Sequence, residues 1–175
     1  LILDVGFDLD PTLPELPKVG IAAEVPAAYG TLSWFGAGPE ESYPDRLAGA
    51  FLGRYTHSLT ELETPYVVPQ ENGNRSLLRE LTLLGGSNRV QPGILSIRAD
   101  RPVNFSVSRY SQENMLAALH TCDLVDRSTG PGGCYTLNID IAQRGVGTAT
   151  CGPDTRDEYR LRPGFFRMKL FLQGR

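Results

Sequence analysis

The chain has 175 residues, of which 41% are hydrophobic and 21% are charged. These proportions are typical of one folded domain with a sizeable core, and they exclude a disordered chain. The formal net charge is -3 at pH 7 and Lys and Arg form no local cluster, which excludes the basic surface that nucleic-acid binding requires. No apolar run is long enough for a membrane span, so we expect neither nucleic acid nor a membrane as a partner.

The first residues show neither an initiator Met nor the basic leader and apolar run of a signal peptide. We therefore expect the chain to begin inside a larger protein. Its three cysteines, Cys122, Cys134 and Cys151, are too few and too scattered for a disulfide framework. Since the odd number favours reduced thiols, we predict a cytoplasmic location.

The same three thiols, together with His120, form a chemically sensible set of zinc ligands. Their spacing lacks the close Cys-x-x-Cys pairs that make such a signal strong. We therefore predict separate thiols and no metal site in this chain.

Hydrophobic residues alternate with polar or small residues along most of the chain, beginning with Leu1, Leu3, Val5, Phe7 and Leu9. Because alternate side chains of an extended strand point to the same face, each such run predicts a strand with one apolar face. Runs of this kind occupy residues 1–9, 19–25, 32–34, 77–83, 103–107, 135–139 and 166–172. Strands covered on one face are typical of antiparallel sheets.

Turn signals such as Gly130-Pro131-Gly132-Gly133 and Pro163-Gly164 separate these runs at the spacing of a sandwich. One short helix is expected over residues 112–120, with Ser111 as its N-cap. A second helical turn is expected near residues 46–52. The pattern as a whole predicts an all-β antiparallel sandwich with one short helix, forming a single structural unit.

Two polar loops, residues 34–46 and 66–75, combine Gly and Pro with charged side chains. One interpretation takes Glu40, Glu41, Asp45 and Glu71 as the source of a carboxylate pair for glycoside hydrolysis. The interpretation that we favour is that these carboxylates pair with arginines and backbone N–H groups and hold the loops in place.

Aromatic side chains of the loops and strands suit a sugar, because a pyranose stacks on an apolar ring face. Trp34, Tyr43, Tyr66 and Tyr135 qualify by type, although Trp34 and Tyr135 are expected in the core because both lie on alternating strands. The chain has no Gly-x-Ser-x-Gly elbow, no phosphate loop and no His-Glu-x-x-His motif, so nucleotide binding is not supported.

Four ordered motifs carry a family resemblance: Trp34-x-Gly-x-Gly-Pro-x-Glu-x-Tyr-x-Asp-Arg46, Pro65-Tyr-x-x-Pro-Gln-Glu-Asn-Gly-x-Arg75, Phe105-x-x-Ser-Arg-Tyr-Ser111, and Leu137-Asn-Ile-Asp followed by Gly-Val-Gly147. Together they resemble the C-terminal region, or small chain, of the large β-galactosidases of glycoside hydrolase family 2. The resemblance implies that residues 1–175 form the later part of the last domain, an incomplete piece of a β-sandwich (supersandwich) of the galactose mutarotase kind.

The resemblance also implies that the catalytic carboxylates lie in another domain, together with the magnesium and sodium ligands of the parent enzyme. This segment is then expected to bind no cofactor, to be inactive alone and to need partner strands from the missing N-terminal domains. The implied partners are a β-galactoside, those domains and, for a homo-oligomer, further copies of the enzyme.

In well-known members of the family, a tryptophan directly before the Leu-Asn-Ile-Asp motif stacks on the sugar. The aligned position here is Thr136, with Tyr135 beside it. We predict Tyr135 and Thr136 as substrate-binding residues, and no catalytic or metal-binding residue. Along a regular strand, Tyr135 points to the opposite face with Leu137 and Ile139, unless a bulge at residues 132–134 re-aims it.

The predicted function is therefore that of a C-terminal segment of a retaining β-galactosidase, which hydrolyses terminal β-D-galactosides with two carboxylates of a separate domain. Two alternatives stay open: a stand-alone carbohydrate-binding module, and a mutarotase-like aldose epimerase. The epimerase needs its own acid and base, and the two histidines, His57 and His120, lie in no motif that would supply them.

Overall fold

The computed structural model describes residues 1–85, 93–146 and 153–174. Its strands are β1 (Ile2–Asp8), β2 (Lys18–Pro26), β3 (Tyr29–Gly38), β4 (Phe51–Ser58), β5 (Arg75–Gly85), β6 (Ile94–Ser108), β7 (Cys134–Gln143) and β8 (Phe165–Gly174). One α-helix, α1 (Gln112–Ala117), and three 3-10 turns, η1 (Leu59–Leu62), η2 (Thr121–Asp123) and η3 (Asp157–Tyr159), complete the elements. Every strand pairing is antiparallel, which confirms the predicted all-β class.

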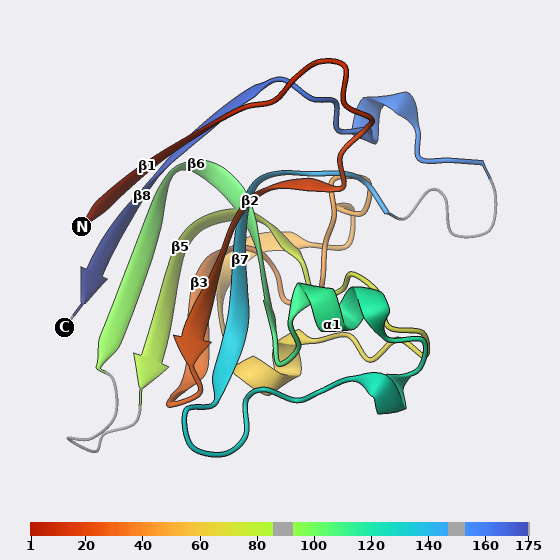
Figure 1. The fold of residues 1–175 in the computed structure, drawn as a ribbon. Coiled ribbons are helices and arrows are strands. Elements are labelled where there is room, and N and C mark those ends of the chain that lie inside the picture. The colour runs from red at the N-terminus through yellow and green to blue at the C-terminus, as the bar shows by residue number, and fades with distance from the viewer. Residues whose placement is uncertain (86–92, 147–152, 175) are drawn as a thin grey trace.

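Strand β6 organises the sheet, because its two halves have different neighbours. One edge pairs with β5 along both halves of the strand. The other edge pairs with β8 over residues 95–99 and with β7 over residues 104–108. Pro102, which has no N–H to donate, lies between the two segments. The sheet therefore divides at β6 into an arm of β8 and β1 and an arm of β7 and β2 (Figure 1).

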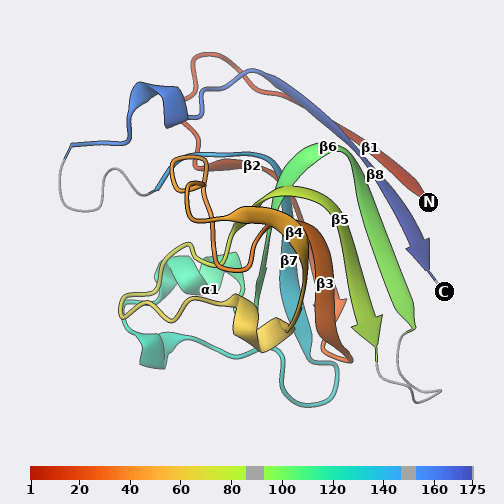
Figure 2. The ribbon, with the colours of Figure 1, turned by 180° about the vertical axis from the view of Figure 1, so that it is seen from behind.

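The two arms and the remaining strands enclose one hydrophobic core, to which β2, β3, β5, β6, β7, β8 and η1 all contribute. Trp34 is fully buried there, with its ring centroid 5.3 Å from that of Tyr55 and 5.7 Å from that of Phe105. The sheet thus folds over itself as an open sandwich (Figure 2). The arms contribute Leu137 and Ile139 of β7 and Met168 and Leu170 of β8 to the same core, and burial of these apolar side chains stabilises the fold.

Along β6 and β7, hydrophobic residues that face the core alternate with polar residues on the opposite face, as the sequence predicts. Val103, Phe105 and Val107 point into the core from β6. The intervening residues of these two strands are also buried, although they are polar; they are Asn104, Ser106, Thr136, Asn138 and Asp140. The loops that follow η1 and β6 cover this polar face, and Gln112 of α1 donates a hydrogen bond of 2.6 Å to Asn138.

Strand β5 departs from the predicted alternation. Leu77 was expected on the same face as Leu81 and Leu83, but it is 41% exposed and has a φ of 59°. Leu78 is buried in its place, and the register with β6 shifts on both sides of that residue. A β-bulge therefore exchanges the two faces of the strand, which a strict period of two does not anticipate.

The expected helical turn at residues 46–52 is also wrong, because these residues form turns and then enter β4. Phe51 and Leu52 pair with Gly38 and Ala37 of β3. This long-range pairing outweighs the local helical pattern. The predicted helix is confirmed but short, and Ser111 caps it by accepting a 3.1 Å hydrogen bond from the N–H of Asn114.

Candidate functional site

The two polar loops are joined by the carboxylate of Glu41. It accepts hydrogen bonds from the hydroxyl of Tyr66, from the hydroxyl of Thr64 at 3.0 Å and from the N–H of Gly73 at 2.9 Å. Arg46 adds an ion pair of 3.2 Å. Burial alone would raise the pKa of Glu41, but these donors outweigh it and the pKa lies below its ordinary value.

Glu41 and Arg75, with the groups that they bind, form a set of contacts that we call the brace. Arg75 lies at the end of the second loop. Its guanidinium is buried and donates to the carbonyl oxygens of Leu62 and Gly73 at 2.6 and 2.7 Å. It also lies over the ring of Trp34, 5.6 Å from the centroid. The predicted pairing of loop carboxylates with arginines and backbone N–H groups is confirmed for Glu41. Arg75 instead donates to carbonyl oxygens and pairs with no carboxylate of the described residues.

Glu71 lies apart from Glu41 and faces the polar side of the sheet. Lys18 of β2 donates to Glu71 at 3.1 Å and lies 4.0 Å from the carboxylate of Asp140. Burial raises the pKa of Asp140 to about 7, the charge of Lys18 opposes this effect, and Glu71 adds to it. Asp140, the last residue of the Leu-Asn-Ile-Asp motif, is thus the most perturbed carboxyl near the predicted sugar segment.

The structure places Tyr135 and Thr136 on opposite faces of β7. Tyr135 is 7% exposed and belongs to the core with Leu137 and Ile139, as regular alternation predicts. Thr136 is buried on the polar face, and its hydroxyl has no hydrogen-bond partner among the described residues. It lines a shallow depression of about 180 Å³ with Gln112 and Arg127. Contact of either residue with a sugar stays a prediction.

The possible zinc ligands do not come together in the described ranges, where no group of three or more His, Cys, Asp and Glu side chains could hold a metal ion. Cys122 is exposed and Cys134 is half-buried, both as free thiols. Cys151 lies outside the described residues. The described residues therefore do not fit a magnesium or sodium site built on carboxylates.

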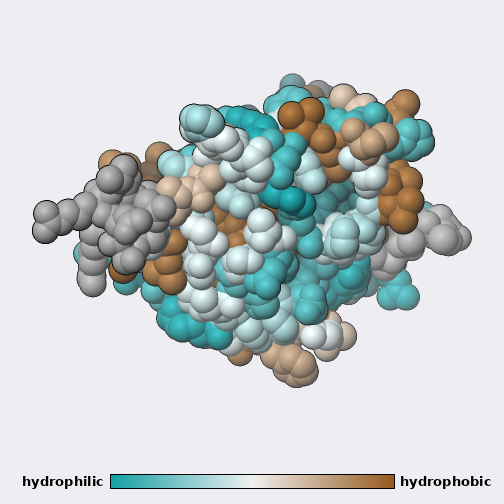
Figure 3. Space-filling model, turned by 90° about the horizontal axis from the view of Figure 1, so that it is seen from below, coloured by the Kyte–Doolittle hydropathy of each residue, from teal (hydrophilic) through white to brown (hydrophobic). Residues whose placement is uncertain are grey.

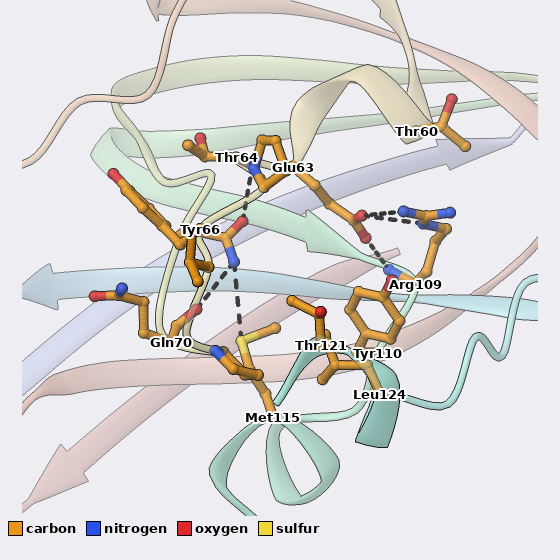
Figure 4. A pocket seen from close by; sticks show the side chains of 14 residues that line it. Thr60, Glu63, Thr64, Tyr66, Gln70, Arg109, Tyr110, Met115, Thr121 and Leu124 are labelled. Atoms are coloured by element: carbon orange, nitrogen blue, oxygen red, sulfur yellow. Dashed lines mark hydrogen bonds and ion pairs between the residues drawn. The ribbon is translucent and has the colours of Figure 1, made fainter. Parts of the chain in front are cut away.

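A cavity of about 540 Å³ lies between residues 60–72 and residues 109–124 (Figure 4). Tyr66 lies on one side of it and Tyr110 on the other, with Met115 between them in the view. Hydroxyl and amide groups of Thr60, Thr121, Gln70 and Asn72 complete a lining that also includes apolar surface, supplied by Pro65, Val67, Pro69 and Leu124.

The ionic groups of the cavity wall neutralise each other. Arg109 and Glu63 form an ion pair of 2.9 Å, and the N–H of Arg109 donates to the same carboxylate at 2.5 Å. The hydrogen bond to Glu63 is the main reason why the pKa of Arg109 lies above its ordinary value. Arg109 also pairs with Asp126 at 3.4 Å, so both ionic groups of the lining are already paired, and the other side chains of the lining are uncharged.

Only part of this cavity lies in motifs that stand out in the sequence. Tyr66, Gln70 and Asn72 belong to the second polar loop, and Arg109 and Tyr110 lie in the Ser-Arg-Tyr-Ser motif. Glu63, which pairs with Arg109, precedes both motifs and gave no signal. The contact joins residues 46 positions apart, a separation that no local pattern reveals.

Seen from below, the hydrophobic side chains of the surface lie in separate areas among hydrophilic ones, not in one continuous patch (Figure 3). The described residues visible on this face therefore form no broad apolar docking surface. No helix in the described part of the chain is both long and apolar enough to cross a bilayer.

Comparison with known proteins gives a consistent relationship. The chain is 42% identical to a β-galactosidase of Vibrio cholerae over 145 residues, which is 83% of this chain and 13% of that protein. It is 34% identical to a β-galactosidase of Vibrio vulnificus over 97% of the chain and 36% identical to one of Arthrobacter sp. over 90%, in both cases 15% of the relative.

The chain thus spans between 13% and 16% of the length of these curated relatives. The family described as "Beta galactosidase small chain" matches residues 2–172, nearly the whole chain. This extent of matching, together with the observed all-β fold, shows that the chain belongs to the β-galactosidase small-chain family.

Proposed function

We propose that this chain is the C-terminal β-sandwich segment of an enzyme that hydrolyses terminal β-D-galactosides. The observation that carries the proposal is the family match over residues 2–172. The segment serves as a scaffold and supplies part of the wall of the sugar pocket. Hydrolysis proceeds with retention, through an acid carboxyl and a nucleophilic carboxylate of another domain.

The contacts of this chain's own carboxylates support a structural role for them. A retaining glycosidase needs a nucleophile and an acid about 5–5.5 Å apart, each with access to the sugar. Glu41 and Glu63 are instead surrounded by donors from the protein itself. If these carboxylates bound a substrate, the donors of the two loops would lose their acceptors. Glu41 and Glu63 are therefore better suited to holding the loops than to catalysis.

Three exposed strand edges favour assembly with other parts of the enzyme. Among the described residues, β1, β2 and β4 each have only one strand partner. Apolar side chains at β1 and β4 remain in solvent, including Ile2 at 64% and Phe51 at 71% exposure. We assign these edges to contacts with the N-terminal domains or with further copies of the enzyme, since open strand edges are liable to aggregate.

Of the predicted pair, Thr136 lies on the polar face of β7 and lines a depression in the surface, whereas Tyr135 packs in the core. The hydroxyl of Thr136 is buried and has no hydrogen-bond partner among the described residues. We place the magnesium and sodium ions of the enzyme in its other domains, and the enzyme itself in the cytoplasm.

The test is hydrolysis by the full-length protein that carries this chain. We expect it to release the aryl group of a nitrophenyl β-D-galactoside, and proton NMR to detect β-galactose as the first product. Absence of hydrolysis, or appearance of α-galactose first, would contradict the proposed activity or its stereochemistry. The 175-residue chain alone is expected to release nothing, and release by that chain would show that it holds a catalytic pair.

A further inference from the structure

We propose that the cavity between residues 60–72 and 109–124 binds an uncharged saccharide, with Tyr66 and Tyr110 as stacking surfaces and with Gln70, Tyr110 and Thr121 as hydrogen-bonding groups. The choice of galactosides as first probes rests on the proposed function. The site itself rests on the chemistry of its wall.

The charged side chains of the cavity wall, Arg109 and Glu63, already have partners. They are bound to each other, Glu63 also accepts from the N–H of Arg109, and Arg109 also pairs with Asp126 at 3.4 Å. A charged ligand would have to break this pair or lie against it without a partner, and either costs free energy. An uncharged polar ligand meets neither penalty.

The wall also combines the two kinds of contact that a sugar ring requires. Pyranose rings present apolar C–H faces and a rim of hydroxyl groups, which match aromatic rings and amide or hydroxyl side chains. In Figure 4, Tyr66 and Tyr110 lie on two sides of the space, with Gln70 and Thr121 beside it. The volume of about 540 Å³ falls in the range of about 300–1,000 Å³ that is typical of small-molecule sites.

Several polar groups of the wall have unused capacity. The hydroxyl groups of Tyr110 and Thr121 form no hydrogen bond with any described residue, and the side-chain oxygen of Gln70 accepts none. Each can therefore bind a ligand hydroxyl without giving up a protein contact. Each such hydrogen bond should strengthen binding by about 3- to 10-fold, so a weak site with several such contacts is expected.

Other members of the wall are held in place before any ligand arrives. The hydroxyl of Tyr66 donates to Glu41, which orients its ring. The side chain of Asn72 accepts from the N–H of Thr64 at 3.0 Å and donates to the carbonyl of Gln70 at 2.9 Å. Such fixed side chains lower the entropic cost of binding. The brace described above thus gives the cavity its shape as well as holding the loops.

The experiment uses the full-length protein with methyl β-D-galactopyranoside, methyl β-D-glucopyranoside and cellobiose as probes. The protein is first treated with 2-deoxy-2-fluoro-β-D-galactosyl fluoride. This reagent forms an ester with the nucleophilic carboxylate of a retaining galactosidase and releases one fluoride ion. Saturation-transfer NMR titrations then measure the sugar binding that remains.

We expect saturable binding of at least one probe by the blocked protein. Tyr110→Phe and Thr121→Val should each weaken it by about 3- to 10-fold, the loss of one hydrogen bond. Tyr159→Phe, which removes a hydroxyl from a tyrosine of η3 outside the cavity, should leave binding unchanged. Thermal unfolding of each variant should match the unmodified protein.

Two results would overturn the inference: no saturable binding of any probe, or identical binding by Tyr110→Phe, Thr121→Val and the control. Failure of the proposed function looks different. In that case no fluoride is released and no galactoside is hydrolysed, whereas the dependence of sugar binding on Tyr110 is still measured.

Discussion

The ammonium group of Lys18 lies 4.0 Å from the carboxylate of Asp140 and donates to Glu71 at 3.1 Å. It thereby connects β2, β7 and the second polar loop through one charge. One oxygen of Asp140 is buried without a hydrogen-bond partner among the described residues. Lys18 is thus shared between two carboxylates, and its charge does not offset the burial of Asp140.

The first prediction concerns the effect of pH on stability. Burial raises the pKa of Asp140 from 3.8 to about 7, despite the opposing charge of Lys18. The unfolded chain therefore releases this proton at lower pH than the folded chain does. The free energy of unfolding should fall as pH rises from about 4 to about 7, by a few kcal/mol at most.

The variant Asp140→Asn should remove this dependence, because its side chain does not titrate. We expect its urea-unfolding free energy to be nearly constant over that interval and to equal or exceed that of the unmodified protein at pH 8. Asp8→Asn, at an exposed position, is the matched control and should keep the original slope. An unchanged slope in Asp140→Asn would show that other groups cause it.

The second prediction concerns Glu41. Glu41→Ala leaves the hydroxyl groups of Tyr66 and Thr64 and the N–H of Gly73 without their acceptor. Removing one partner from such a buried network should cost roughly 3–5 kcal/mol of unfolding free energy, measured in urea at pH 7. Glu80→Ala breaks only the exposed pair with Arg54, and its cost should stay within about 1 kcal/mol. Equal losses would contradict the role of Glu41 as a brace.

The third prediction concerns Gly73, which has a φ of +71°. A Cβ at this position would lie 2.6 Å from the carbonyl oxygen of Leu62, the oxygen to which Arg75 donates. Gly73→Ala should therefore lower the unfolding free energy by roughly 2–4 kcal/mol, through strain and through displacement of that carbonyl. Gly49→Ala is the control, because nothing lies within 4 Å of its added Cβ. If the two variants unfold alike, the backbone at Gly73 is not constrained as described.

The strands were predictable because hydrophobic and polar residues alternate wherever a strand pairs regularly with its neighbours. Val103, Phe105 and Val107 therefore face the core as predicted. The prediction fails at Leu77, since a bulge is set by the partner strand and adds no signal of its own to the sequence. It also fails at β4, whose pairing with a strand distant in sequence outweighs its local pattern.

The sequence predicted which loops carry the polar residues of the site, but not which residues contact each other. Polar residues between Gly and Pro identified the loops of Glu41 and Arg75, but their partners lie at separations such as the 32 residues between Glu41 and Gly73. The cavity depends on the same long-range geometry, because Arg109 and Glu63 are 46 residues apart and meet only in the folded chain. A single sequence gives residue types and local spacing, and it does not give these distances.

The last prediction tests the predicted sugar contact at Thr136 in the full-length protein. The resemblance places a stacking tryptophan at this position, so Thr136→Trp should lower KM for an aryl β-galactoside by about 3- to 10-fold, the gain of one aromatic contact. Thr136→Val keeps the shape without the hydroxyl and should raise KM by a similar factor if the hydroxyl binds sugar. Tyr135→Phe keeps the core packing, and an unchanged kcat and KM would show that the Tyr135 hydroxyl does not bind substrate.

If neither Thr136 variant alters KM or kcat while both unfold at the original temperature, residue 136 lies outside the sugar pocket and the segment acts as scaffold alone.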